Sequence, residues 1–261
     1  MSLPLTPTFV LGLVLLVLVA GAVNGLAGFG FAMVSTMVLA SVIDPALAVV
    51  FVILPLVAVN LSLVGDLSKT DLRTCGHRFF PLLVPALVGA LLGMVLIDFL
   101  PERPLRLVLG VLSLGFVVSA QNRVSVPGLD RAREGCFVET TPALVGVGGI
   151  SGLVFGGTNV GVQFVAYLRS CDLSHGLFVG VVALLFLGLN SIRVGAAGVL
   201  GLYPDLLVVW ISAAAAVPAV FGVAVGKRFR ERVTERTRKG LVLGLLTLIG
   251  LRLVAAGFGL V

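Results

Sequence analysis

The chain repeats part of its own sequence, and this internal duplication limits its fold more than any other feature. Residues 84–93 (VPALVGALLG) match residues 217–226 (VPAVFGVAVG). The LVLG sequence at 107–110 recurs at 241–244, at nearly the same spacing. A chain that contains two copies of one pattern is expected to fold as two related halves.

The duplication extends toward the N-terminus of each half. Asn60 aligns with Asn190, and Gly25-Leu26 aligns with Gly152-Leu153, each pair followed by further glycines. A polar stretch that contains Pro127-Gly128 and charges of both signs separates the two copies, as a flexible linker does. The predicted units are a first repeat at 1–120, a cytoplasmic linker at 121–141 and a second repeat at 142–261.

Both halves are too apolar for a soluble globule. Hydrophobic residues make up 59% of the chain and charged residues 11%, a composition typical of integral membrane proteins. The N-terminal apolar run lacks the basic region and cleavage site of a signal peptide, so we expect it to remain in the mature chain. Six runs approach the roughly 20 residues that cross a bilayer: 46–65, 80–97, 105–120, 176–200, 205–226 and 240–260.

The distribution of Lys and Arg orients these spans. Short cytoplasmic loops are enriched in both residues, so the basic segments 66–78 and 227–239 are predicted to be cytoplasmic. The loop 201–205 matches 66–78 in the other half and carries no basic residue. The loop 98–106 matches 227–239 and carries only Arg103 and Arg106. Matching loops therefore fall on opposite sides of the membrane, which predicts an inverted repeat.

Two further apolar segments, 8–42 and 142–168, must each begin and end on the same side of the membrane in this topology. Glycines interrupt both, at Gly28-Phe29-Gly30 and at Phe155-Gly156-Gly157. We predict that each segment forms two short helices or a re-entrant hairpin that turns near these glycines. The expected fold is an all-α, polytopic membrane protein with two inverted repeats, each with one glycine-broken segment and three full spans.

The sequence NGLAGFG at 24–30 and its weaker echo SGLVFGG at 151–157 also suggest a family. Together with the repeated Pro-Ala-x-x-Gly-x-x-x-Gly elements, they resemble the sulfite exporter TauE/SafE family over nearly the whole chain. The resemblance implies a plasma-membrane (inner-membrane) transporter of a small anion, such as sulfite, a sulfonate or sulfoacetate. The second half departs from the pattern, because Thr158 and Asn159 follow its glycines.

Paired helix breaks near the membrane midplane indicate a binding site. A break leaves backbone amides at the N-terminus of the next helix, where negative charge is favoured. The alternative is that the glycines only let helices approach closely, which is our interpretation of Gly89, Gly93, Gly222 and Gly226. The candidate substrate-binding residues at the breaks are Asn24, Gly28, Phe29, Gly30, Gly156, Gly157, Thr158, Asn159 and Gln163.

Arg193 is the most informative single residue, because it lies in an apolar run with no acidic residue nearby in sequence. Burial of an unpaired cation in a membrane is costly, so Arg193 is a candidate for contact with an anionic substrate. Asn190 shares its helix face, whereas the first half has Asn60 but Leu63 in place of the arginine. Alternatively, Arg193 snorkels or binds backbone carbonyls; Arg252, near the C-terminus, is expected to snorkel.

The acidic residues are informative by their positions. All twelve lie in loops or at the ends of the spans, so the sequence shows no midplane carboxylate that relays protons or binds sodium. Export of an anion down an inside-negative potential needs no such group.

Other functions have weaker support. Ser151, within GISG, and His175 could form the dyad of an intramembrane serine protease, and a membrane scaffold without transport is a second alternative. Cys75, Cys136 and Cys171 have no metal-ligand spacing, and no cofactor is indicated. The basic run 227–239 is interpreted as a cytoplasmic loop, not as a nucleic-acid site. The expected partners are a small anion and the lipid bilayer, and a homodimer is left open.

Overall fold

The computed structural model describes residues 4–65, 69–97, 99, 101–120, 141–169, 175–230, 232 and 235–259. Its regular structure in these segments is entirely helical, so the expected all-α fold is confirmed. The predicted linker lies outside the described residues, apart from Thr141. In chain order the helices are α1 (Pro7–Ala27), α2 (Phe31–Ala40), α3 (Pro45–Val64), α4 (Lys69–Ile97), α5 (Glu102–Ala120), α6 (Thr141–Thr158), α7 (Val162–Arg169), α8 (His175–Val199), α9 (Leu206–Phe229) and α10 (Glu235–Gly257).

Five stretches of helix in the described chain are long and apolar enough to cross a membrane. Four are predicted spans: Pro45–Val64, Phe80–Ile97, Leu177–Val199 and Leu206–Phe229. The fifth, Pro7–Ala27, corrects the expectation that 8–42 forms two short helices, because its first piece is a full-length helix. The remaining predicted spans correspond to α5 and α10, which both begin with charged residues. Of these two helices, α10 contains a shorter apolar stretch, Leu246–Gly257.

Local signals explain where several helices begin. Asp44 and Asp205 accept a hydrogen bond from the backbone N–H of Leu47 and Val208, at 2.9 and 3.0 Å, and so act as N-caps of α3 and α9. Thr6 caps α1 in the same way. Pro55 inside α3 cannot donate to the carbonyl of Phe51, and the hydroxyl of Ser212 on α9 donates to that carbonyl instead. The carbonyl that the proline leaves without a helical donor thus links α3 to α9.

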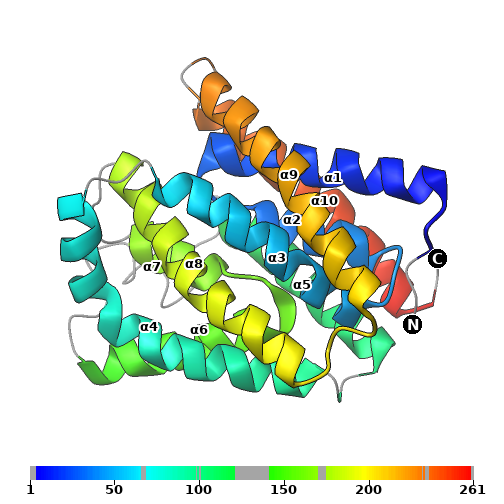
Figure 1. Cartoon of the computed structure of the whole chain (residues 1–261), viewed down its shortest axis with the longest axis horizontal. Helices are drawn as coiled ribbons and strands as arrows, with labels where there is room; N and C mark the ends of the chain where they lie inside the picture. The colour runs from blue at the N-terminus through cyan, green and yellow to red at the C-terminus, as the bar shows by residue number, and fades with distance from the viewer. Residues whose placement is uncertain are drawn as a thin grey trace.

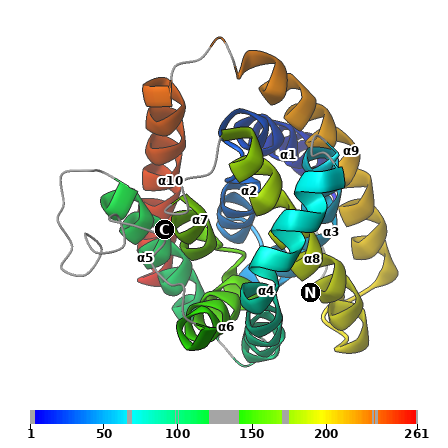
Figure 2. The same ribbon diagram turned by 90° about the vertical axis from the view of Figure 1, so that its left-hand side faces the viewer.

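The helices pack in reciprocal pairs. α1 lies along α9, and α4 lies along α6 (Figures 1 and 2). Both pairs are parallel: Gly89 and Gly93 of α4 meet successively later turns of α6, and Gly222 and Gly226 meet successively later turns of α1. At each of these four glycines an added Cβ would overlap a backbone carbonyl oxygen of the partner helix. Their predicted role in helix packing is confirmed.

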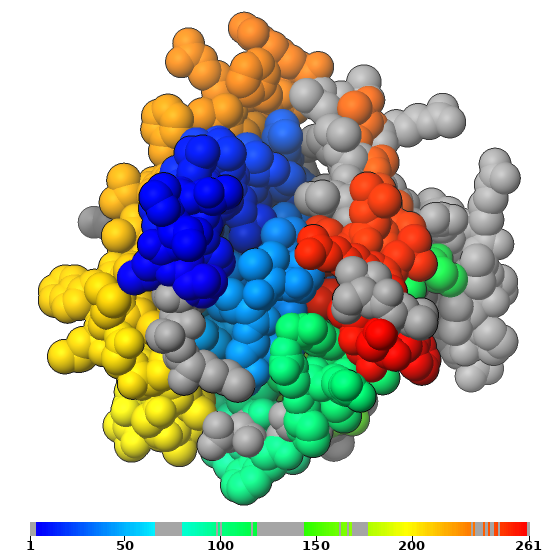
Figure 3. Space-filling view, turned by 90° about the vertical axis from the view of Figure 1, so that its right-hand side faces the viewer, coloured from blue at the N-terminus to red at the C-terminus, as the bar shows by residue number. Residues whose placement is uncertain are grey.

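α3 and α8 contact each other and form the centre, while α5 packs on α10 at one side. The serine hydroxyl of Ser113 donates to the carbonyl of Leu246 at 2.8 Å across the α5–α10 contact. The start of α1, the start of α3, the start of α5 and the α8–α9 loop gather on one face (Figure 3). Large apolar side chains such as Trp210 (71% exposed) and Phe221 (62%) point outward from α9, as lipid-facing residues do.

Candidate functional site

The first helix break lies where the sequence predicts it. α1 ends at Ala27, Gly28 adopts φ 83° and Gly30 adopts φ 112°, and α2 begins at Phe31. Glycine suits both positions because L side chains rarely adopt positive φ. The amide oxygen of Asn24, on the last turns of α1, accepts a hydrogen bond from the backbone N–H of Phe31 at 3.1 Å. Asn24 therefore holds the two pieces together as a cap.

The second break lies four residues later than Phe155-Gly156-Gly157, near which it is predicted. Gly156 and Gly157 belong to the last turn of α6, and the turn comprises residues 159–161. Asn159 takes the left-handed conformation with φ 57°, which asparagine tolerates better than most residues. Gly156 is required in the helix instead, because a Cβ there would overlap the carbonyl of Ala90 on α4. The predicted break is therefore present, but its turn follows Phe155-Gly156-Gly157 instead of including these residues.

Side chains occupy two of the backbone amides at these breaks. The side chain of Asn24 occupies the N–H of Phe31. In the second half the hydroxyl of Thr158 accepts from the N–H of Val160 at 3.1 Å and donates to the carbonyl of Val154. Asn24 and Thr158 thus stabilise the breaks in this structure, and these two amides are not available to a ligand while those bonds are made.

Arg193 lies at the second break and is completely buried, at 0% exposure. Its Nη1 donates to the amide oxygens of Asn159 at 2.8 Å and of Asn190 at 2.9 Å. Its Nη2 donates to the carbonyl of Gly156 at 2.8 Å. The guanidinium also lies 4.8 Å from the centre of the Phe155 ring, within range for a cation–π contact. Of the two alternatives for Arg193, snorkelling is wrong, while the bond to a backbone carbonyl is present.

Asn159 connects this arginine to the first half of the chain. Its side-chain nitrogen donates to the hydroxyl of Thr36 on α2 at 2.9 Å and to the carbonyl of Val49 on α3 at 2.8 Å. Its oxygen accepts from Arg193. One amide side chain therefore joins α2, α3, α6 and α8. The sequence gives no signal for the role of Thr36 or Val49, because these partners lie more than a hundred residues away.

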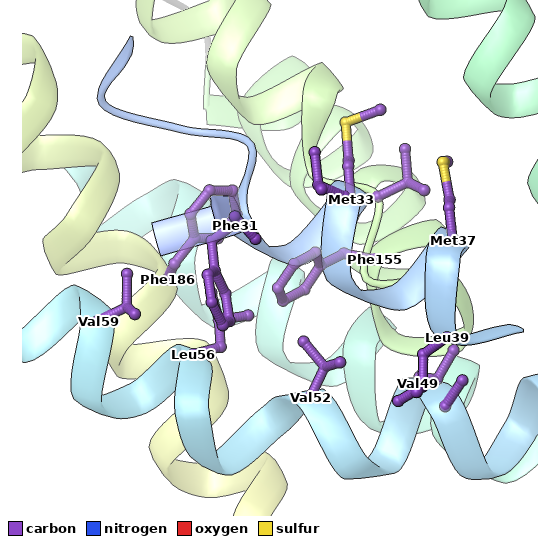
Figure 4. Close-up of a cluster of buried hydrophobic side chains, with 14 of the residues drawn as sticks. Phe31, Met33, Met37, Leu39, Val49, Val52, Leu56, Val59, Phe155 and Phe186 are labelled. Atoms are coloured by element: carbon purple, nitrogen blue, oxygen red, sulfur yellow. The ribbon is translucent and has the colours of Figure 1, made fainter. Parts of the chain in front are cut away.

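Aromatic rings lie next to the network. Phe155 stacks on Phe186 with 5.0 Å between ring centres, and Phe164 meets both rings edge to face. Figure 4 shows Phe155 and Phe186 among apolar side chains of α2 and α3, including Phe31 and Val52. The apolar packing excludes water, which strengthens the interactions of the Arg193 charge with nearby dipoles.

No acidic side chain pairs with Arg193 in the described chain. The ion pair found among the described residues, between Arg106 and Glu102, is on α5. A guanidinium has five N–H groups, and the bonds to Asn159, Asn190 and Gly156 use three of them. The Nε–H is buried without a partner. Arg193 therefore keeps its charge uncompensated and has unused donors.

The remaining candidate residues occupy different environments. Asn60, the counterpart of Asn190, is buried, and its side-chain nitrogen has no hydrogen-bond partner among the described residues. The amide oxygen of Gln163 on α7 is also buried without one. Phe29 packs, partly buried, against the core at the first break. Arg252 is exposed on α10, consistent with its expected outward orientation.

Features of the alternative functions lie partly outside the described residues. Ser151 is buried on α6, whereas the side chain of His175 is not described. The side chains of His77 and of the three cysteines, Cys75, Cys136 and Cys171, also lie outside the described part of the structure. Within the part of the chain that is described, no group of His, Cys, Asp and Glu is arranged to hold a metal ion.

The family model of the sulfite exporter TauE/SafE family matches residues 13–253. The match covers both breaks, Arg193 and all of its hydrogen-bond partners. Neither a curated protein nor a solved structure shows significant similarity to the chain.

Proposed function

The chain belongs to the sulfite exporter TauE/SafE family of membrane transporters, and we propose that it moves one small sulfur oxyanion or sulfonate past Arg193. The observation that carries this proposal is the complete burial of Arg193 without an acidic partner in the described chain. A buried cation without a counter-ion is unstable relative to the same cation with an anion beside it. The missing negative charge is supplied by the substrate.

The binding groups follow from the hydrogen bonds of the site. Asn159, Asn190 and the Gly156 carbonyl hold the guanidinium in place, and its unused N–H groups donate to the anion. Oxyanions accept charge-assisted hydrogen bonds from guanidinium groups readily. Asn60 and Gln163, whose amide groups have unpartnered atoms, contribute once the substrate or the helices move.

The two halves supply the motion in this proposal. The parallel pairs α1–α9 and α4–α6 join the first helix of each half to the fourth helix of the other. This reciprocity supports two inverted repeats at 1–120 and 142–261. Asn159 links the halves at the substrate site, so rocking of one half against the other changes the side from which Arg193 is reached. Anion export then follows the inside-negative potential of a plasma membrane.

Flux measurements in proteoliposomes test the proposal. Purified protein is reconstituted, and uptake of sulfite, thiosulfate, sulfoacetate, taurine and a short carboxylate is measured at two clamped membrane potentials. We expect saturable, potential-dependent flux of an anionic member of this panel. We expect Arg193→Gln to reduce it about 100-fold or more, because the only buried charge of the described site is removed.

Two further variants sharpen the outcome. Arg193→Lys keeps the charge but loses the planar donor geometry, so it should retain a few per cent of the flux. Arg252→Gln removes an exposed arginine of α10 and should leave the flux unchanged. Wild-type flux in both Arg193 variants would overturn the assignment of the site. A folded protein that moves none of the anions would overturn the proposed substrate class.

A further inference from the structure

Tyr203 lies in the loop between α8 and α9, ten residues after Arg193. Its side chain packs against a small buried cluster that contains Ala197 on the last turns of α8. Ala197 is four residues after Arg193, so the two residues share one face of the helix. The other members of this cluster are Val50 and Ile53 on α3 and Met94 on α4. Tyr203 therefore lies near the Arg193 site, on its side toward the α8–α9 loop.

The loop holds Tyr203 in this place through its backbone. The N–H of Leu202 donates to the carbonyl of Ala197 at 3.0 Å, and Gly201 adopts φ 67°, the geometry of a glycine-terminated helix. At the other end of the loop, the Asp205 side chain binds the N–H of Val208. Tyr203 is thus fixed between two capped helix ends.

The hydroxyl of Tyr203 is buried and has no hydrogen-bond partner among the described residues. Buried tyrosine hydroxyls usually find a partner, and an unsatisfied one is costly. Burial raises the pKa of Tyr203 to about 12, and the nearby charge of Arg193 offsets part of that rise. The hydroxyl therefore stays protonated at neutral pH and is available as a donor.

Two buried donors have no partner among the described residues, the Nε–H of Arg193 and the O–H of Tyr203. Tyr203 packs on the cluster that contains Ala197, one helical turn after Arg193. From this juxtaposition we infer that Tyr203 is a second substrate-binding residue, which donates to an oxygen of the anion held by Arg193 and closes the site toward the α8–α9 loop. The inference rests on the proposed function.

A site with both donors selects anions by their number of oxygens. Sulfite and sulfonates have three terminal oxygens, enough to accept from the guanidinium and from the hydroxyl together. A carboxylate has two, so when the guanidinium binds it at both oxygens, no separate oxygen remains for the hydroxyl, which must share one with the guanidinium in a poorer geometry. Sites that leave a buried polar group poorly paired with the wrong ligand discriminate against it. Tyr203 is therefore a specificity-determining residue for three-oxygen anions.

Tyr203→Phe tests the inference, because it removes the hydroxyl and keeps the ring on its apolar neighbours. We expect the KM for the three-oxygen anion to rise about tenfold, with little change in its maximal flux. The flux ratio of that anion to a short carboxylate should fall by a similar factor. Tyr167→Phe, which removes the hydroxyl of the chain's other tyrosine, is the matched control and should change neither quantity.

A double-mutant cycle separates this inference from the proposed function. If Arg193 and Tyr203 bind one anion, Tyr203→Phe should have little further effect on the residual flux of Arg193→Lys.

Wild-type KM and anion preference in Tyr203→Phe, with flux lost in Arg193→Gln, would overturn the role of Tyr203 alone. Wild-type flux in Arg193→Gln would overturn the proposed function. A parallel fall in thermal stability and flux of Tyr203→Phe, with KM and preference unchanged, would reduce Tyr203 to a packing residue.

Discussion

The two helix breaks occupy matching places in the two halves but are built differently. At the first, Gly28 and Gly30 provide the turn, and the side chain of Asn24 caps the next helix. At the second, Asn159 takes the left-handed conformation, and its side chain joins both halves to the Arg193 charge. The first break is thus formed by residues of its own segment, whereas the second is part of a hydrogen-bond network that includes a charged side chain.

The difference continues along the central helices. Asn190 on α8 accepts from Arg193 and donates to the carbonyl of Phe186. Asn60 on α3 aligns with it, but Leu63 takes the place of the arginine and the Asn60 nitrogen has no described partner. A duplicated scaffold can therefore carry a single charge in one copy. One charge suits one small anion, which is why function is expected to be asymmetric although the packing is reciprocal.

Replacing the side chain of the second break should have the largest effect. Asn159→Gly keeps the left-handed backbone but removes hydrogen bonds to Thr36, Val49 and Arg193. We expect flux to fall about 100-fold, since the guanidinium loses its orientation. Stability should fall by ~3 kcal/mol, because buried polar groups lose their partners. Flux assays in proteoliposomes and thermal unfolding in detergent measure the two effects.

The first break provides the comparison for this variant. Asn24→Ala removes only a helix cap, which costs about 1 kcal/mol, and flux should stay within about threefold of wild type because no charged group is disturbed. Equal losses of flux in Asn24→Ala and Asn159→Gly would show that the two breaks act alike, contrary to the asymmetry described above.

The packing glycines should behave symmetrically, in contrast to the breaks. Gly89→Ala on α4 and Gly222→Ala on α9 each place a methyl group against a backbone carbonyl of the partner helix, that of Gly149 or Leu18. Each should lower stability by ~2 kcal/mol through overpacking. Gly12→Ala, where nothing lies within 4 Å of the added carbon, is the control and should leave the unfolding midpoint unchanged. Unequal midpoints for Gly89→Ala and Gly222→Ala would contradict reciprocal packing.

Features that depend on short stretches of sequence could be predicted. The break at Gly28 and Gly30 and the packing role of Gly222 and Gly226 follow from glycine spacing alone. The contact between Asn190 and Arg193 follows from their separation of three residues on one helix. These features require no knowledge of what lies opposite.

Features that depend on partners from distant parts of the chain could not be predicted from the sequence. The position of the second break is set by Ala90, which requires Gly156 within α6, and by Thr36 and Val49, which hold Asn159. The sequence also indicated free amides at the breaks, but side chains of the same segments occupy two of them. Tyr203 carried no motif, because its relation to Arg193 arises from the path of the α8–α9 loop.

The smallest effect on stability is expected for Asn60, where the first half keeps an amide without its arginine. Because the Asn60 nitrogen bonds to no described group, Asn60→Leu should change stability by less than about 1 kcal/mol. Flux should nevertheless fall about threefold to tenfold, since a buried amide without a partner is costly to keep unless it binds substrate in another conformation. Asn190→Leu, which removes an acceptor of Arg193, should lower both flux and the unfolding midpoint. Undiminished flux in Asn60→Leu would confine the substrate contacts to the second half, and the asymmetry between the halves would then be complete.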